Sequence, residues 1–284
     1  MNKLNLSIAI CTINPDICLR LLKSLMNFIN KNDQIIVLVD GRIYIDHTKP
    51  EFLSFCQKYN IEVIINDENI GLSYCRNKAM QIAKNQYIVF FDDDTILLNN
   101  TLEHFRQSFI DGKTVGGARL TAPEHYKRKM GVLSEGYSYV FGIHSCEEKI
   151  WGACFGFDVN IAKENNLYFE PLLGRKGRGL QSGDDTLFVK EYLNISNNPF
   201  FINYPVQHCF NPNRLTVKYI LRRVFWQGRS EIRRSNFKLG WQKEKERSKN
   251  NHNMLQIFTS LCLRFTFLLG AFVEQIQHSV RRDS

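Results

Sequence analysis

The stretch GLSYCRNKAMQIAKNQYIVFFDDDTIL (71–97) places a helix pattern, a short turn and an apolar strand directly before three consecutive carboxylates. Residues 71–84 have helical spacing, and YIVFF (87–91) has the continuous apolar character of a strand buried on both faces. Three neighbouring carboxylates repel each other and resist leaving water, so the strand end at Asp92–Asp94 favours a cation or a phosphate-bearing ligand. The alternative is a solvated turn in which an Asp caps the next element.

The alternation of strand and helix patterns extends over the first 110 residues. It predicts strands at 6–11, 34–40, 61–66 and 87–91, and helices at 15–29, 50–59 and 71–84. Strand, helix and strand in repetition produce parallel strands with helical crossovers, so we predict an α/β fold. Beyond residue 112 the pattern is less regular, and we expect strands at 114–120, 136–143 and 151–158 and helices near 158–166, 184–193 and 214–234.

The composition is that of a globular protein of 284 residues, with 44% hydrophobic residues and a formal net charge of +9. The positive charge indicates attraction to nucleotide phosphates or an anionic membrane surface and does not require nucleic acid, which we exclude as a partner. The eight cysteines form no C-x-x-C pair and are interpreted as reduced core thiols. Together with an N-terminus that lacks a signal-peptide pattern, they predict a cytoplasmic location.

Polar side chains follow each of the first four predicted strands. They are Thr12 and Asn14 after the first, Asp40 after the second, Asn66–Asn69 after the third and Asp92–Asp94 after the fourth. In open parallel sheets, ligands bind beyond the carboxyl ends of the strands. Four polar strand ends at one edge therefore favour the ligand-site interpretation of the triple Asp over a solvated turn.

A second acidic pair, Asp184–Asp185, follows a glycine-rich basic loop, GRKGRGLQSG (174–183). This setting is expected where an anionic ligand meets a general base, although acidic residues in a first helical turn can also serve as caps. His208 follows a predicted strand and is either a metal ligand beside carboxylates or a structural histidine. The arginine-rich helix at 214–234 either binds phosphates or presents a solvated or membrane-facing surface.

The C-terminal segment 254–282 is apolar for about a bilayer-spanning length. Because Arg264 near its middle is costly inside a bilayer, we expect an interfacial amphipathic helix that contacts the inner face of the plasma membrane through residues 254–278. The alternative is a helix that packs on its own domain or on a second copy in a homodimer. We therefore divide the chain into a domain at 1–235 and a helical, membrane-associating extension at 236–284.

Five segments in this order resemble the bacterial family 2 glycosyltransferases of GT-A fold. They are LSIAICTINP (6–15), VLVD (37–40), NIGLSYCRNKAMQIAKNQYIVFFDDDT (69–95), WGACFGF (151–157) and GRGLQSGDDTLF (177–188), and the resemblance covers roughly residues 5–230. It implies a mixed, mostly parallel sheet flanked by helices, with a C-terminal helical extension. It also implies a nucleotide-sugar donor, held with Mn²⁺ or Mg²⁺.

The resemblance assigns roles to residues by position. Donor binding falls to Thr12, Asn14, Asp40, Asn69, Arg76, Asp92, Asp93, Trp151 and Gly152, and the metal to Asp94, Asp92 and His208. Asp185 corresponds to the catalytic aspartate of the family's Glu-Asp motif and Asp184 to its glutamate, so the resemblance implies that both are catalytic residues. Two departures from the family pattern are the shorter Asp184 and the Asp40–Gly41 pair, where the family often has two acids.

The resemblance implies an inverting, metal-dependent transfer from a nucleotide-diphosphate donor, a UDP-sugar, to a saccharide or lipid-linked acceptor. A basic, membrane-associated enzyme of this kind suits surface polysaccharide or glycoconjugate synthesis. A nucleotidyltransferase shares the acidic metal ligands, but it usually has a glycine-rich phosphate loop after the first strand, which CTINPD (11–16) lacks. The third alternative is a non-catalytic nucleotide-sugar-binding protein, which only a turnover assay separates from an enzyme.

Overall fold

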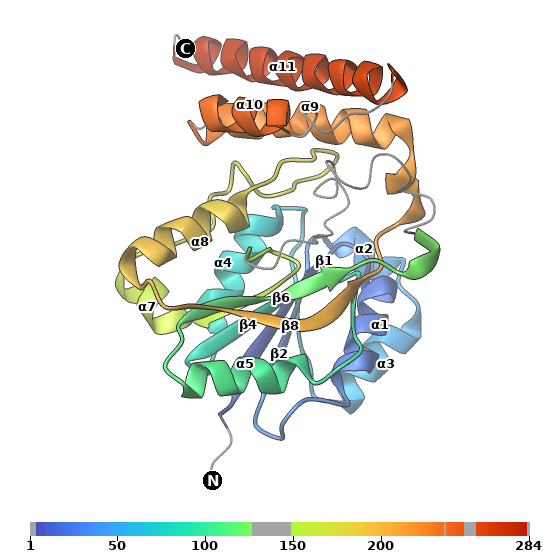
Figure 1. Cartoon of the computed structure of the whole chain (residues 1–284). Helices are drawn as coiled ribbons and strands as arrows, with labels where there is room; N and C mark the ends of the chain where they lie inside the picture. Colours follow the sequence, from blue (N-terminus) through green and yellow to red (C-terminus); the bar gives the residue numbers. More distant parts are fainter. Residues whose placement is uncertain (1–3, 127–148, 236, 247–253, 283–284) are drawn as a thin grey trace.

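The computed structural model describes residues 4–126, 149–235, 237–246 and 254–282. Their strands form one eight-stranded sheet in the order β3-β2-β1-β4-β7-β6-β8-β5 (Figure 1). The strands are β1 (Leu6–Thr12), β2 (Gln34–Val39), β3 (Glu62–Ile65), β4 (Tyr87–Asp92), β5 (Thr95–Leu97), β6 (Val115–Thr121), β7 (Cys154–Asp158) and β8 (Pro199–His208). This mixed, mostly parallel sheet flanked by helices confirms the predicted fold class.

The parallel part of the sheet is the part that the sequence pattern predicts. Strands β3, β2, β1 and β4 pair in parallel, linked by helices α1 (Pro15–Leu25), α3 (Pro50–Lys58) and α4 (Leu72–Ile82). Helix α1 ends at Leu25, before the expected residue 29. The pattern did not predict the short helix α2 (Arg42–Asp46), strand β5 or helix α5 (Thr101–Ile110).

The alternation of side chains along the strands builds two hydrophobic layers. Ile8 and Ile10 of β1 belong to the layer on one face, and Ala9 between them belongs to the layer on the other face. Because successive strand residues point to opposite faces, a sheet covered on both sides needs apolar residues at every position. This requirement explains why the central strands are continuous apolar runs.

Antiparallel strands complete the sheet and lead to the later helices. Strand β7 pairs antiparallel with β4 and β6, and β8 pairs parallel with β6 and antiparallel with β5. Helices α7 (Val159–Glu164) and α8 (Asp184–Ile195) lie near the expected positions. The strand expected at 136–143 lies outside the described residues.

Three C-terminal helices stack above the strand ends, with α11 as the outermost layer (Figure 1). They are α9 (Val217–Arg233), α10 (Phe237–Glu246) and α11 (Met254–Arg282). A Cβ on Gly228 of α9 would lie 2.0 Å from the Phe267 carbonyl oxygen of α11, so these backbones touch closely. Glu274 of α11 accepts hydrogen bonds from Arg229 at 2.7 Å and Arg233 at 2.8 Å. Helix α11 is therefore anchored to α9 by both close packing and ion pairs.

The charged stretch QKEKERSKNNHN (242–253) has the composition of a linker or an exposed helix. Its first part, up to Glu246, belongs to α10, and residues 247–253 lie outside the described residues. Among the described residues one helical segment, Phe258–Ser279, is long and apolar enough to cross a membrane by length and composition alone.

Candidate active site

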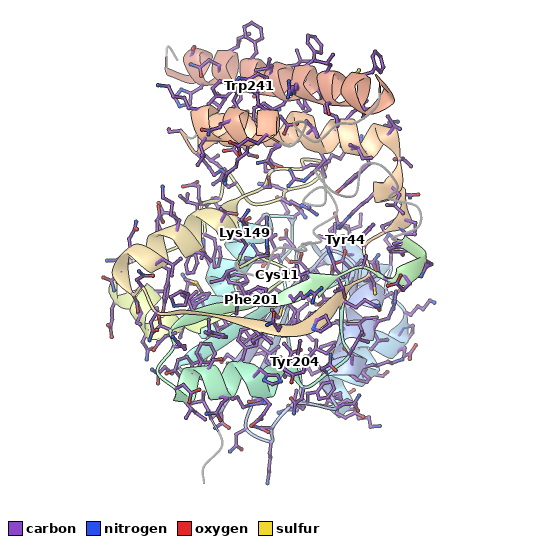
Figure 2. All side chains as sticks on the ribbon, viewed as in Figure 1. Cys11, Tyr44, Lys149, Phe201, Tyr204 and Trp241 are labelled. Carbon is purple, nitrogen blue, oxygen red and sulfur yellow. The ribbon has the colours of Figure 1, made fainter. Side chains whose placement is uncertain are left out.

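A cavity of about 1100 Å³ lies where the carboxyl ends of the central strands face helices α8 and α9. Figure 2 labels three residues of its lining: Cys11, Lys149 and Phe201. The cavity brings together every predicted site residue except Asn14: Thr12, Asp40, Asn69, Arg76, Asp92, Asp93, Asp94, Trp151, Gly152, Asp184, Asp185 and His208.

Asn14 lies outside this lining, at the N-terminus of α1. Its side-chain oxygen accepts a hydrogen bond from the Ile17 backbone N–H at 3.2 Å, and its side chain is exposed. An Asn at this position satisfies one of the unpaired N–H groups at a helix start. The geometry thus gives Asn14 a capping function, and of the two residues predicted at the first strand end, Thr12 is the one that lines the cavity.

The triple Asp begins at the last residue of β4, Asp92, and continues through the turn to β5, and β8 brings His208 beside it. Thr95 of β5 pairs with His208, which places the His208 Nε2 atom 2.9 Å from Asp94 Oδ1. Arg214 lies 3.3 Å from the other Asp94 oxygen. One ligand atom each from Asp92, Asp94 and His208 lies within 4.8 Å of the others, so these three could hold one metal ion.

The three neighbouring carboxylates differ in protonation behaviour because their partners differ. Burial and the charge of Asp94 raise the pKa of Asp93 to about 7, although the Thr12 hydroxyl donates a hydrogen bond to it. Burial also raises the pKa of Asp92. Burial acts on Asp94 in the same direction, but His208 and Arg214 outweigh it and hold the pKa of Asp94 well below its usual range. Asp94 therefore has the lowest pKa of the three carboxyl groups.

Arg76 of α4 is the buried centre of the site. Its guanidinium donates to Asp184 Oδ2 at 2.8 Å and to the Gly152 carbonyl at 3.0 Å, and it lies 3.4 Å from Asp92 Oδ1. It is 3% exposed, and the guanidinium lies over the ring of Phe155 at 5.6 Å. One cation thus links β4, α8 and the segment before β7.

Asp184 and Asp185 have different surroundings although they are adjacent in the first turn of α8. Asp184 is 4% exposed and is paired with Arg76. Asp185 is partly exposed; its Oδ2 accepts the Gly152 N–H at 2.7 Å, and its Oδ1 accepts the Thr186 N–H at 2.8 Å. A Cβ on Gly152 would lie 2.7 Å from Asp185 Oδ2 and 2.9 Å from Arg76. Only glycine at 152 leaves room for both side chains.

Asp40 and Asn69 organise the loop that begins α4. The Asp40 carboxylate accepts hydrogen bonds from the Ile70 and Gly71 N–H groups, each at 2.9 Å. Asn69 donates to the Asp40 carbonyl at 3.1 Å and accepts from the Gly177 N–H at 3.0 Å. The end of β2 is thereby tied to the basic loop, and both residues remain in the cavity lining.

The arginines of the 214–234 segment do not share one face or one function. Arg214 pairs with Asp94, and Arg229 and Arg233 pair with Glu274 of α11. Arg222 donates to the Arg178 carbonyl at 3.0 Å, whereas Arg223 and Arg234 line the cavity. Sequence reasoning did not assign Arg214 to the acidic site, although the H-x-x-x-x-x-R spacing from His208 was a usable signal.

This combination of a mixed sheet, acidic strand ends and a basic loop is that of glycosyltransferases with the GT-A fold. The model of the family described as "Glycosyl transferase family 2" matches residues 7–163. The chain belongs to this family, as its motifs predicted.

One relative and two solved structures illustrate the similarity. The glucosyl-dolichyl phosphate glucuronosyltransferase of Haloferax volcanii is 22% identical over an alignment of 214 residues, which covers 70% of this chain and 66% of that protein. The chain thus spans just under two thirds of that relative's length. S. aureus TarS 1–349 in complex with UDP is 16% identical, with a TM-score of 0.54 over 99% of this chain and 92% of that one. Mannosyltransferase PcManGT from Pyrobaculum calidifontis, in complex with GDP-Man and Mn²⁺, is 9% identical, with a TM-score of 0.56 over 95% of this chain and 86% of that one.

Proposed function

We propose that the protein transfers a hexosyl group from a UDP-sugar to an acceptor hydroxyl group, with inversion at the anomeric carbon. The observation that carries this proposal is that one cavity holds a cluster of three metal-ligand residues and a partly exposed carboxylate, Asp185, fixed on a helix. The similar TarS structure contains UDP, which supports uridine as the nucleoside of the donor.

Asp92, Asp94 and His208 would hold the divalent cation, Mn²⁺ or Mg²⁺. Two carboxylates and an imidazole are a suitable donor set for Mn²⁺, and the cation in the PcManGT structure is Mn²⁺. Asp94, whose carboxylate oxygens contact His208 and Arg214, is the carboxylate best suited to such an ion. When bound, the metal supplies Lewis-acid stabilisation to the departing diphosphate.

Asp185 acts as the general base in this proposal, and Asp184 positions the site. The Gly152 and Thr186 N–H groups orient the Asp185 carboxylate, which accepts the proton of the acceptor hydroxyl as the new glycosidic bond forms. Asp184 is buried and forms an ion pair with Arg76, so its role is to hold Arg76 against Gly152. The sequence-based assignment of both acids as catalytic is therefore narrowed to Asp185.

The nucleoside and diphosphate lie on the strand-end side of the cavity in this proposal. Thr12, Asp40, Asn69 and Arg76 form the wall beside the uridine, and Asp93 faces the ribose. Arg214 and the basic loop at Arg175–Lys176 line the same cavity, where they attract the diphosphate. Trp151 and Gly152 border the transferred sugar.

Two measurements test this function. UDP-sugars with Mn²⁺ are screened by thermal shift, and UDP release is followed for each donor that stabilises the protein. We expect Mn²⁺-dependent UDP binding that Asp94→Ala removes, while Asp67→Ala at an exposed ion pair leaves it intact. Mn²⁺-dependent UDP binding retained in Asp94→Ala would refute the metal assignment. Binding without any turnover would indicate a non-catalytic binding protein, and release of pyrophosphate would indicate a nucleotidyltransferase.

We also propose that the acceptor is lipid-linked and that the protein lies peripherally on the cytoplasmic face of the membrane. The Haloferax volcanii relative is named for a dolichyl-phosphate acceptor. Side chains project from α11 on the side away from α9 (Figure 2). That side carries an exposed apolar stripe: Phe258, Leu261, Phe265, Leu268, Leu269, Phe272 and Ile276. The spacing of these residues is that of one helix face.

Vesicle flotation tests the membrane contact. We expect the full chain to float with phosphatidylglycerol-containing vesicles, and the triple variant Leu261→Ser, Phe265→Ser, Phe272→Ser to remain in solution. The matched control, Ile43→Ser with Leu53→Ser and Ile110→Ser, changes exposed apolar residues outside α11 and should still float. A wild-type protein that does not float but is dimeric, and that becomes monomeric in the triple variant, would assign the stripe to a homodimer instead.

A further inference from the structure

The inner face of α9 carries a polar cluster whose members line the cavity: Arg223, Gln227, Glu231 and Arg234. Their spacing along the chain, four residues then four then three, places them on one side of the helix. The opposite side packs against α11 through Gly228, Arg229 and Arg233. Helix α9 therefore has one face that packs on α11 and another that lines the cavity. The cavity-lining face has no role in the donor site described above.

The cluster is a connected hydrogen-bond chain. Arg223 donates to Gln227 Oε1 at 3.1 Å, and Gln227 donates to Glu231 Oε1 at 2.7 Å. Arg234 donates to the same Glu231 oxygen. Ser182, from the loop before α8, donates its hydroxyl hydrogen to Gln227 Oε1 at 2.9 Å. These bonds fix the cluster in relation to α8.

Several buried polar atoms in and beside this cluster have no hydrogen-bond partner among the described residues. Glu231 is 5% exposed, and its Oε2 atom has no hydrogen-bond partner among the described residues. The same holds, within that part of the chain, for Arg234 Nε and for Gln181 Oε1 in the neighbouring loop. Buried polar atoms of this kind are costly unless a ligand or ordered water pairs with them.

The cluster lies next to the proposed base. The Arg234 NH1 atom lies 2.6 Å from where a Cβ on Gly183 would be, and Gly183 directly precedes Asp184–Asp185. Gly183 has a φ of +98°, so glycine both suits the backbone and leaves room for the guanidinium. A cavity of about 1100 Å³ is also larger than the roughly 300–1,000 Å³ that a single ligand usually fills.

We infer that this cluster is the binding site for the acceptor's saccharide unit, with Glu231 and Arg234 contacting its hydroxyl groups. A sugar hydroxyl both donates and accepts hydrogen bonds, so neighbouring hydroxyls satisfy the carboxylate oxygen and the guanidinium N–H together. The unpaired Glu231 Oε2 and Gln181 Oε1 atoms need hydrogen-bond donors, which an ionised phosphate does not supply, and an apolar chain would leave the cluster unpaired. The inference rests on the proposed function, because it assigns the acceptor side of the same reaction.

The test uses the full chain, the UDP-sugar identified by the donor screen, Mn²⁺ and a panel of methyl glycosides of common hexoses and N-acetylhexosamines. We expect at least one glycoside to raise UDP release above the rate of donor hydrolysis. Glu231→Gln and Arg234→Gln should each raise the KM for that glycoside about tenfold or more, because each loses a charged hydrogen-bonding group. The donor-hydrolysis rate and the affinity for UDP should stay unchanged.

The matched control is Glu246→Gln, which neutralises an exposed carboxylate on α10 and should leave the KM unchanged. Thermal melting checks the folding of each variant, and Arg234→Gln provides an independent result if Glu231→Gln is unstable. An unchanged KM in the folded variants, an equal loss of UDP affinity, or the absence of any stimulating glycoside would overturn the inference. Failure of the wild type to bind or hydrolyse any donor would instead refute the proposed function.

Discussion

Replacing Arg76 by Met tests whether the buried cation holds the site together. The substitution removes the donor to Asp184 at 2.8 Å and leaves that carboxylate 4% exposed, with the Ser73 hydroxyl at 3.3 Å as its remaining side-chain donor. Removing one partner of a buried ion pair lowers the free energy of unfolding by about 3–5 kcal/mol. At about 2–4 °C per kcal/mol for a protein of this size, we expect the melting temperature to fall by about 6–20 °C.

A double-mutant cycle separates the ion pair from the loss of packing. Asp184→Asn in the Arg76→Met background removes the uncompensated charge, so the double variant should be more stable than Arg76→Met alone. The control Arg42→Met removes a pair whose side chains are 58% and 84% exposed, so it should cost no more than about 1 kcal/mol. Urea unfolding measures the free energy of unfolding of the wild type and of each variant. Equal destabilisation by Arg42→Met and Arg76→Met, or no recovery in the double variant, would refute the reasoning.

Three further predictions follow from other contacts. Gly152→Ala should lower kcat by about 10–100-fold, because its Cβ displaces Asp185 and Arg76. The activity control is Gly112→Ala, whose Cβ has open space and whose φ of +80° costs backbone stability without touching the site. Equal kcat values in the two variants would contradict the close contact at Gly152. His208→Ala should weaken UDP binding in the presence of Mn²⁺ more than in EDTA, as measured by calorimetry; equal losses would exclude a ligand role. Burial raises the pKa of Glu274, but the hydrogen bonds from Arg233 and Arg229 outweigh this effect and lower the pKa below 4.5. The wild type should therefore be more stable than Glu274→Gln, with the full difference above pH 4.5 and a smaller difference as the pH falls below it. An advantage independent of pH in acid unfolding would refute the ion pairs.

The sequence predicted the parallel half of the fold because its strands are apolar on both faces and its crossover helices are amphipathic. Strand β5 was missed because it has only the three residues Thr95–Leu97, which is too short for a periodic signal. Its pairing with β8 depends on residues more than a hundred positions apart, which local patterns do not reveal.

The sequence predicted which residues make up the candidate site better than it predicted the contacts among them. The strand-end rule placed Thr12, Asp40 and the triple Asp at one edge, and the structure brings them into one cavity. The rule could not show that Asn14 caps α1 or that Asp184 pairs with Arg76, because both depend on side-chain direction. The division of the arginines of α9 between Glu274 and the cavity likewise depends on where α11 packs.

The central claim is that Asp185 is the general base and that its neighbour Asp184 is not. The most direct measurement compares transfer rate and UDP affinity in Asp185→Asn, whose amide keeps the shape of the side chain but cannot accept the acceptor's proton. We expect transfer to fall by about 100-fold or more while the Kd for UDP with Mn²⁺ stays close to that of the wild type. Transfer at the wild-type rate, or a loss of UDP affinity as large as the loss of rate, would contradict the assignment.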